Sequence, residues 1–256
     1  MGHGEFLWCD LATFDVEEIL DFYASALGWG YRSERFQDGQ DYHYARSGTD
    51  VVAGLYEMPA AFRKDGFASI WMNYIGIDDI ESGITKAEML GGARVLGPAR
   101  FGQGAEIAMI RDPGGAVFTL FNGEHLQPKS RRAAQGRPFW SELRTPNPEV
   151  SAGFYSGLFG WKIDGPNEFG RYRVRNLADA MIASLQQINP IGTKLPASWR
   201  VTFGVRNPDD AARTIDANGG TVAPALDGED DSLVATDPNG TEFTIAPAKS
   251  ERGWWR

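Results

Sequence analysis

A strand, an amphipathic helix and a Gly-Trp exit appear twice along the chain. Residues 5–12 read as a strand, and from Val16 to Leu27 the apolar residues recur at helical spacing. The same order returns between residues 138 and 161. The matched positions are each separated by 132 residues: Trp8 and Trp140, Phe22-Tyr23 and Phe154-Tyr155, and Gly28-Trp29 and Gly160-Trp161. Constant spacing between copies indicates an internal duplication.

A finer repeat lies inside each copy. Helix caps are predicted at Asp15, with Glu18 as its capping-box partner, and at Asp79, Asn147 and Asn207, at intervals of roughly 64 residues. Short strands follow each helix, and the turns Asp112-Pro113-Gly114-Gly115 and Asp237-Pro238-Asn239-Gly240 each connect a last pair of strands. Residues 59–66 and 189–196 are predicted to be loops. The pattern predicts four βαβββ modules and an α+β fold.

One such module exposes a sheet face and is marginal alone, so the modules are expected to pair. Each pair would form a curved mixed sheet of roughly eight strands, with helices outside and a concave face inside where a ligand site is expected. The predicted domains are residues 1–125 and 138–250, joined by a linker at 126–137 and followed by a tail at 251–256. Trp254-Trp255 in the tail are expected to dock on a domain face, form a dimer contact or fray.

The composition of the chain limits the classes of binding partner that we expect. The chain has 256 residues and a formal net charge of −9, which argues against a nucleic-acid or anionic-membrane surface. The basic cluster Lys129-Ser130-Arg131-Arg132 lies in the linker and reads as a solvated tether. Cys9 is the single cysteine, so no intramolecular disulfide forms, and its apolar strand predicts a buried role. No secretory signal or membrane span is recognised, so a cytoplasmic location is expected.

The first strand, the capped helix, the Phe-Tyr…Leu-Gly-Trp exit and the terminal Asp-Pro-x-Gly hairpin resemble the vicinal oxygen chelate superfamily. That superfamily includes glyoxalase I, extradiol dioxygenases, fosfomycin-resistance enzymes and bleomycin-resistance proteins. The resemblance covers nearly the whole chain, and the two-domain arrangement also resembles glyoxalase-like members. It implies the paired βαβββ architecture, and it leaves the function open because this fold hosts many chemistries.

The resemblance also implies where metal ligands would stand. A His or Gln on the first strand corresponds to Trp8 and Trp140, a His on the strand before the second helix to Met72 and Arg200, and a Glu on the last strand to Thr119 and Thr244. None of these six side chains is an imidazole or carboxylate, the usual ligands for a divalent metal here. We therefore expect no metal and no cofactor, which puts glyoxalase and dioxygenase chemistry in doubt.

Three histidines remain, His3, His43 and His125, and each is expected to be solvated or structural. A relocated metal site that uses His43 and a carboxylate is the alternative for an unrecognised metal enzyme.

Strand alternation assigns side chains to the two sheet faces. Cys9, Leu11, Ser141, Leu143, Phe118, Leu120, Phe243 and Ile245 are expected to pack under helices. The first predicted cleft then holds Trp8, Asp10, Met72, Tyr74, Thr119 and Phe121. The second holds Trp140, Glu142, Arg144, Arg200, Glu242 and Thr244.

The charges in these clefts have two interpretations. Arg144 with Glu242 and Arg200 with Glu142 could pair simply to satisfy buried charge, or one arginine could bind a carboxylate or phosphate of a ligand. Asp10, if buried, would have a raised pKa and could act as an acid or base, or it could accept backbone hydrogen bonds.

Three functions follow from these expectations. The first is a metal-independent small-molecule-binding protein that holds an aromatic or apolar ligand, with a polar or anionic group, in aromatic-lined clefts. The second is a metal-independent lyase or isomerase that uses Asp10 or Glu142 as acid or base. The third is an interaction protein with a degenerate cleft. The sequence allows a monomer or a homodimer.

Overall fold

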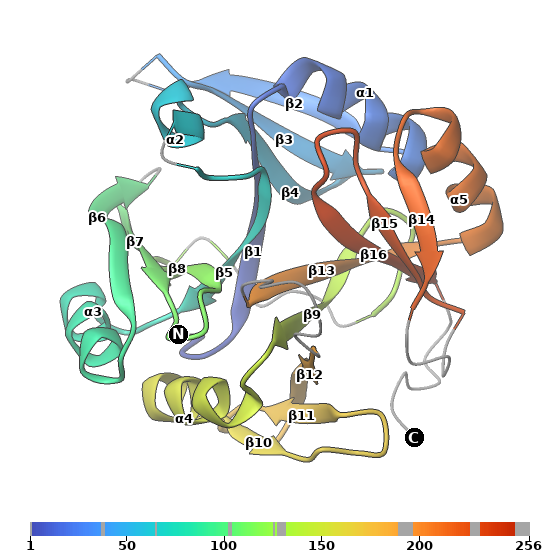
Figure 1. Ribbon diagram of the computed structural model, residues 1–256. Helices are drawn as coiled ribbons and strands as arrows, with labels where there is room; N and C mark the ends of the chain where they lie inside the picture. Colours follow the sequence, from blue (N-terminus) through green and yellow to red (C-terminus); the bar gives the residue numbers. More distant parts are fainter. Residues whose placement is uncertain are drawn as a thin grey trace. The chain divides into compact units, whose positions relative to one another are not determined.

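The structure is a computed structural model that describes residues 2–36, 39–64, 66–101, 104–124, 126, 132–188, 197–225 and 231–248. Its elements follow the predicted modular order (Figure 1). Those of the first half (residues 1–125) are β1 (Phe6–Thr13), α1 (Val16–Leu27), β2 (Gly30–Arg35), β3 (Asp41–Ser47), β4 (Asp50–Glu57), α2 (Ala60–Lys64), β5 (Ile70–Gly76), α3 (Ile80–Met89), β6 (Ala93–Phe101), β7 (Ala105–Arg111) and β8 (Val117–Asn122).

The second half (residues 138–250) repeats this order with two helices among its described residues. Its elements are β9 (Pro138–Thr145), α4 (Pro148–Phe159), β10 (Lys162–Asp164), β11 (Arg171–Arg175), β12 (Met181–Gln187), β13 (Ser198–Val205), α5 (Pro208–Ala217), β14 (Thr221–Pro224), β15 (Leu233–Thr236) and β16 (Glu242–Pro247). None of the helices that the structure describes is long and apolar enough to span a membrane.

Each half forms one eight-stranded sheet. The first has the strand order β2-β3-β4-β1-β5-β8-β7-β6, and the second has the equivalent order β10-β11-β12-β9-β13-β16-β15-β14. Both sheets are mixed, since β1 pairs with β4 in parallel while β3 pairs with β4 antiparallel, and β9 and β11 pair with β12 in the same two ways. The predicted α+β fold of four βαβββ modules, paired into two sheets, is confirmed.

Helix boundaries follow the predicted caps, with one exception. Asp79 accepts a hydrogen bond from the Ser82 amide at 2.7 Å, and the side chains of Asn147 and Asn207 also cap their helices. The predicted capping box at Asp15 is wrong, because its side chain makes no cap hydrogen bond. The acidic side chains in the first turn of α1 still favour the helix N-terminus through its dipole.

Two other predictions about loops and tails have different outcomes. Residues 59–66 are not simply a loop, because the short helix α2 forms within them. The predicted loop at 189–196, His125, the tail with Trp254-Trp255 and residues 129–131 of the basic cluster lie outside the described residues.

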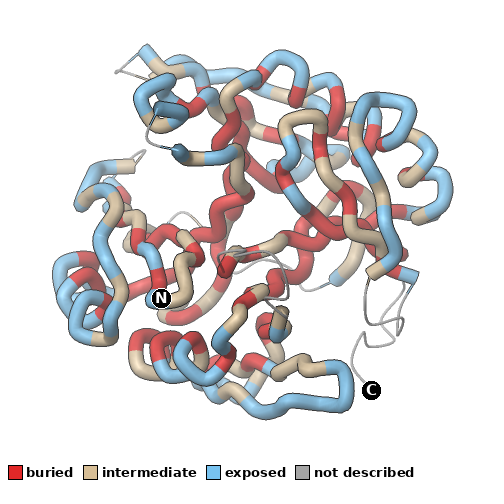
Figure 2. Tube along the Cα trace, viewed as in Figure 1, coloured by how far each residue is buried: buried red, intermediate tan, exposed pale blue. Residues whose placement is uncertain are grey.

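The hydrophobic cores divide the chain into two compact units that do not follow the halves. One unit contains Met1–Trp8, Met72–Lys129 and Ser141–Arg200, and the other contains Cys9–Trp71, Ser130–Trp140 and Val201–Arg256. Each unit therefore takes one module from each half. Buried residues run along β1 in Figure 2. As predicted, Cys9, Leu11, Phe243 and Ile245 are fully buried in one core, and Leu143, Phe118 and Leu120 lie in the other.

A tyrosine on the first helix of each half organises each core. In one unit the Trp71 indole donates to the Tyr23 hydroxyl at 2.9 Å, and that hydroxyl donates to Asp237 in the hairpin turn at 3.2 Å. In the other unit Trp199 donates to Tyr155 at 2.8 Å, and the negative charge of Asp112 raises the pKa of Tyr155 in addition to the larger effect of burial. The repeated Tyr, Trp and Asp residues are therefore core residues, and their repetition reflects packing.

These turn aspartates give a pH prediction. Burial raises the pKa of Asp237 above its ordinary value, although hydrogen bonds from the backbone of Thr241 and Asn239 oppose this. A raised pKa in the folded state stabilises the fold at pH values below the unfolded pKa, and this stabilisation is lost as the pH rises through the folded pKa. We expect the unfolding free energy of the wild type to fall relative to that of Asp237→Asn across this acidic window. Urea titrations at a series of pH values measure it, and a constant difference would contradict the assignment.

The Gly-Trp exits make a matched pair of contacts. The Trp29 indole donates to the carbonyl of Gly136 at 2.7 Å, and the Trp161 indole donates to that of Gly4 at 2.8 Å. The segment that carries Gly136 also bonds β13, since the Gly136 amide donates to the Gly204 carbonyl at 2.8 Å. The end of the predicted linker is therefore held by hydrogen bonds.

A glycine makes this close approach possible. A Cβ atom at Gly204 would lie 2.4 Å from the Ala134 carbonyl oxygen, closer than real contacts allow. We expect Gly204→Ala to lower the unfolding free energy by about 1–3 kcal/mol, because the obstacle is backbone. Gly30→Ala is the control, since nothing lies within 4 Å of a Cβ there. Equal urea midpoints for the two variants would show that the segment can move aside.

Candidate functional site

In the first half, the side chain of Asp10 lies on the face of β1 that is turned away from the core containing Cys9 and Leu11. Its neighbours Cys9 and Leu11 are fully buried in the helix-side core, as alternation predicts. Asp10 is itself 0% exposed, and its Oδ1 accepts a hydrogen bond from the Tyr42 hydroxyl at 2.5 Å. A buried carboxylate with a phenolic donor is held in one position and can accept hydrogen bonds on both oxygens.

Aromatic rings surround this pair. The centroid of the Tyr42 ring lies 5.3 Å from the ring centroid of Phe36, 4.7 Å from that of Tyr44 and 6.3 Å from that of Tyr56. Burial raises the pKa of Tyr56, and the negative charge of Asp10 adds to this. Burial likewise raises the pKa of Tyr44. The hydroxyls of Tyr44 and Tyr56 therefore stay protonated at neutral pH.

Gly54 makes the Asp10–Tyr42 contact possible. It is the residue opposite Asp10 on β4, and a Cβ there would lie 1.8 Å from the Tyr42 hydroxyl oxygen. The position of Tyr42 was missed from the sequence. To predict it, one would have to know how β3 pairs with β4, where Tyr42 lies opposite Tyr56.

Other residues of the first predicted cleft are brought together on β5 and β8. Tyr74 lies opposite Thr119 in the register, and the Tyr74 and Phe121 rings are 6.4 Å apart. Phe101 on β6 joins them, 5.7 Å from Tyr74, and was not predicted. Met72 is buried on the same strand as Tyr74, and Trp8 on β1 is partly exposed. The environment is aromatic, as expected.

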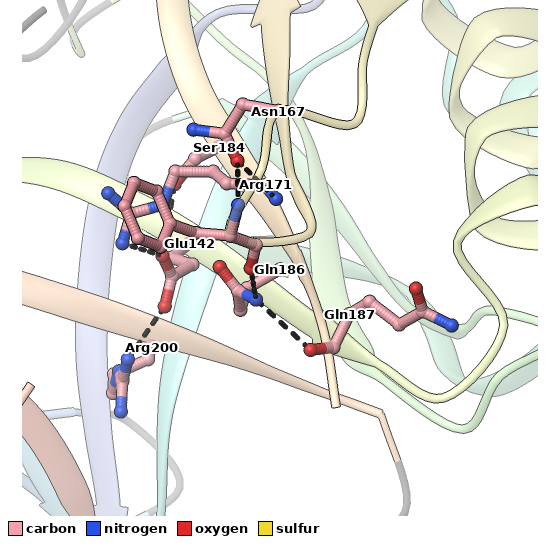
Figure 3. Close-up of polar contacts among 8 residues, drawn as sticks. Glu142, Asn167, Arg171, Ser184, Gln186, Gln187 and Arg200 are labelled. Atoms are coloured by element: carbon pink, nitrogen blue, oxygen red, sulfur yellow. Dashed lines mark hydrogen bonds and ion pairs between the residues drawn. The ribbon is translucent and has the colours of Figure 1, made fainter. Parts of the chain in front are cut away.

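In the second half, Glu142 on β9 lies between two arginines (Figure 3). The Nη2 atom of Arg200 on β13 donates to its Oε1 at 2.6 Å, and Nη2 of Arg171 on β11 donates to its Oε2 at 3.2 Å. The Ser184 hydroxyl donates to the same Oε2 at 3.3 Å. The side chains of Glu142, Arg171 and Arg200 are 8%, 16% and 12% exposed. We call the four residues Glu142, Arg171, Ser184 and Arg200 the arginine–glutamate cluster.

The charge balance of the cluster favours the carboxylate form of Glu142. Burial alone would raise the pKa of Glu142, but the positive charges of Arg200, Arg171 and Arg144 outweigh it and lower the pKa overall. Glu142 is thus ionised at neutral pH. This fits an anchor for guanidinium groups better than a proton donor.

A polar turn braces Arg171. The Asn167 side chain accepts hydrogen bonds from the amides of Phe169 and Arg171, at 3.0 and 2.9 Å, and the Gln186 side chain donates to the carbonyls of Phe169 and Gln187 (Figure 3). These bonds fix the backbone where β11 begins. Arg171 and Ser184 were missed from the sequence, because their strands follow loops of unpredictable length.

The remaining residues of the second predicted cleft have mixed outcomes. The predicted pairing of Arg200 with Glu142 is observed, and the predicted pairing of Arg144 with Glu242 stays a prediction. Trp140 is 8% exposed on β9, and Thr244 on β16 lies opposite Thr202.

The halves share one layout with different chemistry. Asp10 and Glu142 occupy matched positions, opposite Gly54 and Ser184 on the parallel neighbour strand. A donor on the next strand reaches each carboxylate, and this donor is Tyr42 in the first half and Arg171 in the second. On this face the matched residues Trp8 and Trp140 are the same in both halves, as are Thr119 and Thr244. The donors Tyr42 and Arg171 differ, as do Met72 and Arg200.

The residues of this fold do not fit a metal ion at the positions where the family resemblance places one. Those positions hold Trp8, Met72 and Thr119 in one half and Trp140, Arg200 and Thr244 in the other, and Arg200 is engaged with Glu142. Among the described residues, no group of three or more His, Cys, Asp or Glu side chains is arranged to hold an ion. His43 contacts Ser33 at 2.8 Å, and His3 lies 3.2 Å from Asp78.

Comparisons with known proteins agree with this architecture. Residues 5–120 match the Glyoxalase/Bleomycin resistance protein/Dioxygenase superfamily, and residues 139–246 match the Glyoxalase-like domain. The chain is 29% identical to "Putative glyoxylase CFP32" of Mycobacterium tuberculosis, over 93% of this chain and 92% of that protein. It is 25% identical to the anthracycline biosynthesis protein DauV of Streptomyces sp., over 93% of this chain and 91% of that protein.

Solved structures show the same fold at low identity. The 2,3-dioxygenase LapB from Pseudomonas sp. KL28 has a TM-score of 0.61 at 14% identity, covering 99% of this chain and 96% of LapB. A Mn(II)-bound glyoxalase from Novosphingobium aromaticivorans has a TM-score of 0.59 at 16% identity, covering 97% of this chain and 85% of that glyoxalase. With one family domain matched in each half, the chain belongs to the glyoxalase/bleomycin resistance protein/dioxygenase superfamily.

Proposed function

We propose that the protein binds a small organic molecule without using a metal ion. The observation that carries this proposal is the chemistry of the six positions described above, where indole, thioether, hydroxyl and guanidinium groups replace the imidazole and carboxylate ligands expected from the family. A protein that keeps the fold but lacks these donors retains the aromatic and polar surfaces of its sheets for recognition.

The ligand that fits best is aromatic or apolar with a polar or anionic group. Tyr74, Phe101 and Phe121 supply neighbouring rings in the first half, and aromatic side chains provide large contact areas with little loss of side-chain freedom. The bleomycin resistance proteins in the family name and the anthracycline biosynthesis relative support a planar organic ligand. A cytoplasmic location and a monomeric or homodimeric state remain part of this proposal.

A binding experiment on metal-free protein tests the proposal. Full-length protein dialysed against EDTA would be titrated with a panel of planar aromatic acids and amides while tryptophan fluorescence is recorded. We expect saturable quenching that is unchanged when Mn²⁺, Fe²⁺ or Zn²⁺ is restored, with no product detected by mass spectrometry. Binding that appears only after metal is restored would overturn the proposal. No binding by any panel member, with or without metal, would favour the interaction protein.

Catalysis without a metal is the second candidate, and the Asp10–Tyr42 pair favours it. A fully buried carboxylate held at 2.5 Å by a phenol is a defined acid–base pair. In this case a panel member would be converted by the metal-free wild type, and Asp10→Asn would abolish turnover while circular dichroism and the melting temperature stay close to wild type. Turnover retained by Asp10→Asn would remove Asp10 from the chemistry.

A further inference from the structure

Three aromatic rings near Asp10 lie almost parallel to one another. The ring planes of Phe36 and Tyr56 are inclined by 17° and 15° to that of Tyr42, with centroid separations of 5.3 and 6.3 Å. Tyr42 and Tyr56 lie directly opposite each other on β3 and β4. Because aromatic groups favour offset-stacked arrangements, a planar ligand that stacks on Tyr56 would adopt the plane that these rings share.

The hydroxyl of Tyr56 is not used within the part of the chain that the structure describes. The Tyr42 hydroxyl donates to Asp10 at 2.5 Å, whereas the Tyr56 hydroxyl makes no hydrogen bond to a described residue. Tyr56 is half-buried, and its oxygen is not one of the enclosed polar atoms that lack a partner, so solvent reaches it. The proton of this phenol is therefore available to a ligand.

The second half uses the matched position differently. Tyr56 and Gln186 are matched because they lie opposite Ala12 on β1 and Arg144 on β9, which share the spacing of the duplication. The Gln186 amide donates to two nearby backbone carbonyls (Figure 3). In the first half, Ala12 places only a methyl group beside Tyr56. The side chain at this position thus braces a turn in one half and keeps a free donor in the other.

The charges that act on Tyr56 favour an uncharged acceptor. Burial raises the pKa of Tyr56, and the only charge in the described chain that raises it further is that of Asp10. The same negative charge would repel an anionic group that accepted the hydrogen bond from Tyr56. An ammonium group offers no acceptor, and a phenol accepts poorly because its ring draws on the oxygen lone pairs. A carbonyl oxygen avoids both problems.

We propose that Tyr56 donates a hydrogen bond to an uncharged acceptor oxygen, such as a carbonyl, on a planar ligand that stacks against its ring. The hydrogen bond to Asp10, which Gly54 makes possible, holds the neighbouring Tyr42 ring in place. This inference rests on the proposed function, and it narrows the polar group of the ligand to a neutral acceptor in the first half of the chain.

Isothermal titration of full-length, metal-free protein with four one-ring probes tests this assignment. Acetophenone carries a neutral carbonyl, benzoate an anionic acceptor and benzylammonium a cationic donor, whereas ethylbenzene has no polar group. We expect acetophenone to bind about fivefold or more tightly than each of the other three probes. This ratio corresponds to the net contribution of one neutral hydrogen bond.

Removal of single hydroxyls separates binding from folding. Tyr56→Phe keeps the ring, so acetophenone binding should weaken about fivefold, while ethylbenzene binding and the urea midpoint stay unchanged. Tyr31→Phe is the matched control, because Tyr31 lies in the same sheet and its hydroxyl donates to the Leu20 carbonyl at 2.9 Å. This control should lower the urea midpoint and leave acetophenone binding as in the wild type.

The outcomes separate the inference from the proposed function. Acetophenone affinity that Tyr56→Phe leaves unchanged would overturn the inference and leave small-molecule binding standing. Tighter binding of benzoate or benzylammonium than of acetophenone would also overturn it, because the favoured ligand would then carry a charge. If none of the four probes binds the wild type, no ring stacks against Tyr56 and the inference fails, while the larger panel decides the proposed function separately.

Discussion

Replacing Trp161 by alanine is expected to lower the free energy of unfolding by about 3–5 kcal/mol, the range for large aromatic side chains in cores. Trp161 is 3% exposed, stacks on Tyr155 at 5.5 Å and on Phe6 at 5.5 Å, and donates its indole hydrogen to the Gly4 carbonyl. The alanine variant loses all of these contacts and leaves a cavity. Urea or thermal denaturation of the purified variant measures the loss.

The matched tryptophan in the first half provides the comparison. Trp29 is 4% exposed, stacks on Tyr23 at 5.4 Å and donates to Gly136. Trp29→Ala should therefore cost a similar amount. Trp161→Phe keeps a ring but loses the indole hydrogen bond, so its cost should be smaller than that of Trp161→Ala. A loss below about 1 kcal/mol for both alanine variants would contradict the assignment of the Gly-Trp exits to the cores.

Removal of the central carboxylate of the arginine–glutamate cluster has the other large expected effect. Glu142→Ala leaves Arg171 and Arg200 without the carboxylate that they share, and breaking a buried ion pair in this way costs about 3–5 kcal/mol. Asp164→Ala is the matched control, because Asp164 pairs with Arg175 at the surface and is 61% exposed. Exposed pairs contribute about 0–1 kcal/mol. Urea denaturation of the two variants compares the cost of losing a buried carboxylate with the cost of losing an exposed one.

The pH dependence of the Glu142→Ala effect provides an independent check. Because the pKa of Glu142 is lowered in the folded state, its contribution to stability is present above the unfolded pKa and is lost as the pH falls through the folded pKa. The difference between wild type and Glu142→Ala should therefore shrink in acid below the ordinary glutamate range. A difference that grows in acid would show that Glu142 is not stabilised as a carboxylate.

The sequence predicted the fold because its signals were local and repeated. The caps at Asp79, Asn147 and Asn207 and the positive-φ glycines Gly28 and Gly160 each set an element boundary through nearby backbone geometry. Strand alternation then assigned the core correctly, since Cys9 and Leu11 needed no knowledge of pairing. The same repetition obscured how the modules share their cores, because the Tyr23–Asp237 contact joins residues far apart in the chain.

The candidate site was only partly predictable for a related reason. Asp10, Glu142 and Arg200 lie on long strands next to strong motifs, so alternation placed them on the correct face. Tyr42 and Arg171 lie on strands whose register depends on intervening loops, and a shift of one residue would turn each side chain to the other face. The donors that hold both carboxylates were therefore not predicted, whereas both carboxylates were predicted as cleft residues.

Metal content tests the central claim most directly. Untagged full-length protein, purified without chelators and desalted, would be analysed for Mn, Fe, Ni, Cu, Zn and Mg by mass spectrometry against the protein concentration. If the protein binds its ligand without a metal ion, we expect far less than one metal ion per chain. The reason is that the family's ligand positions hold Trp8, Met72, Thr119, Trp140, Arg200 and Thr244. One tightly bound divalent ion per chain, retained through desalting and needed for ligand binding, would contradict the account.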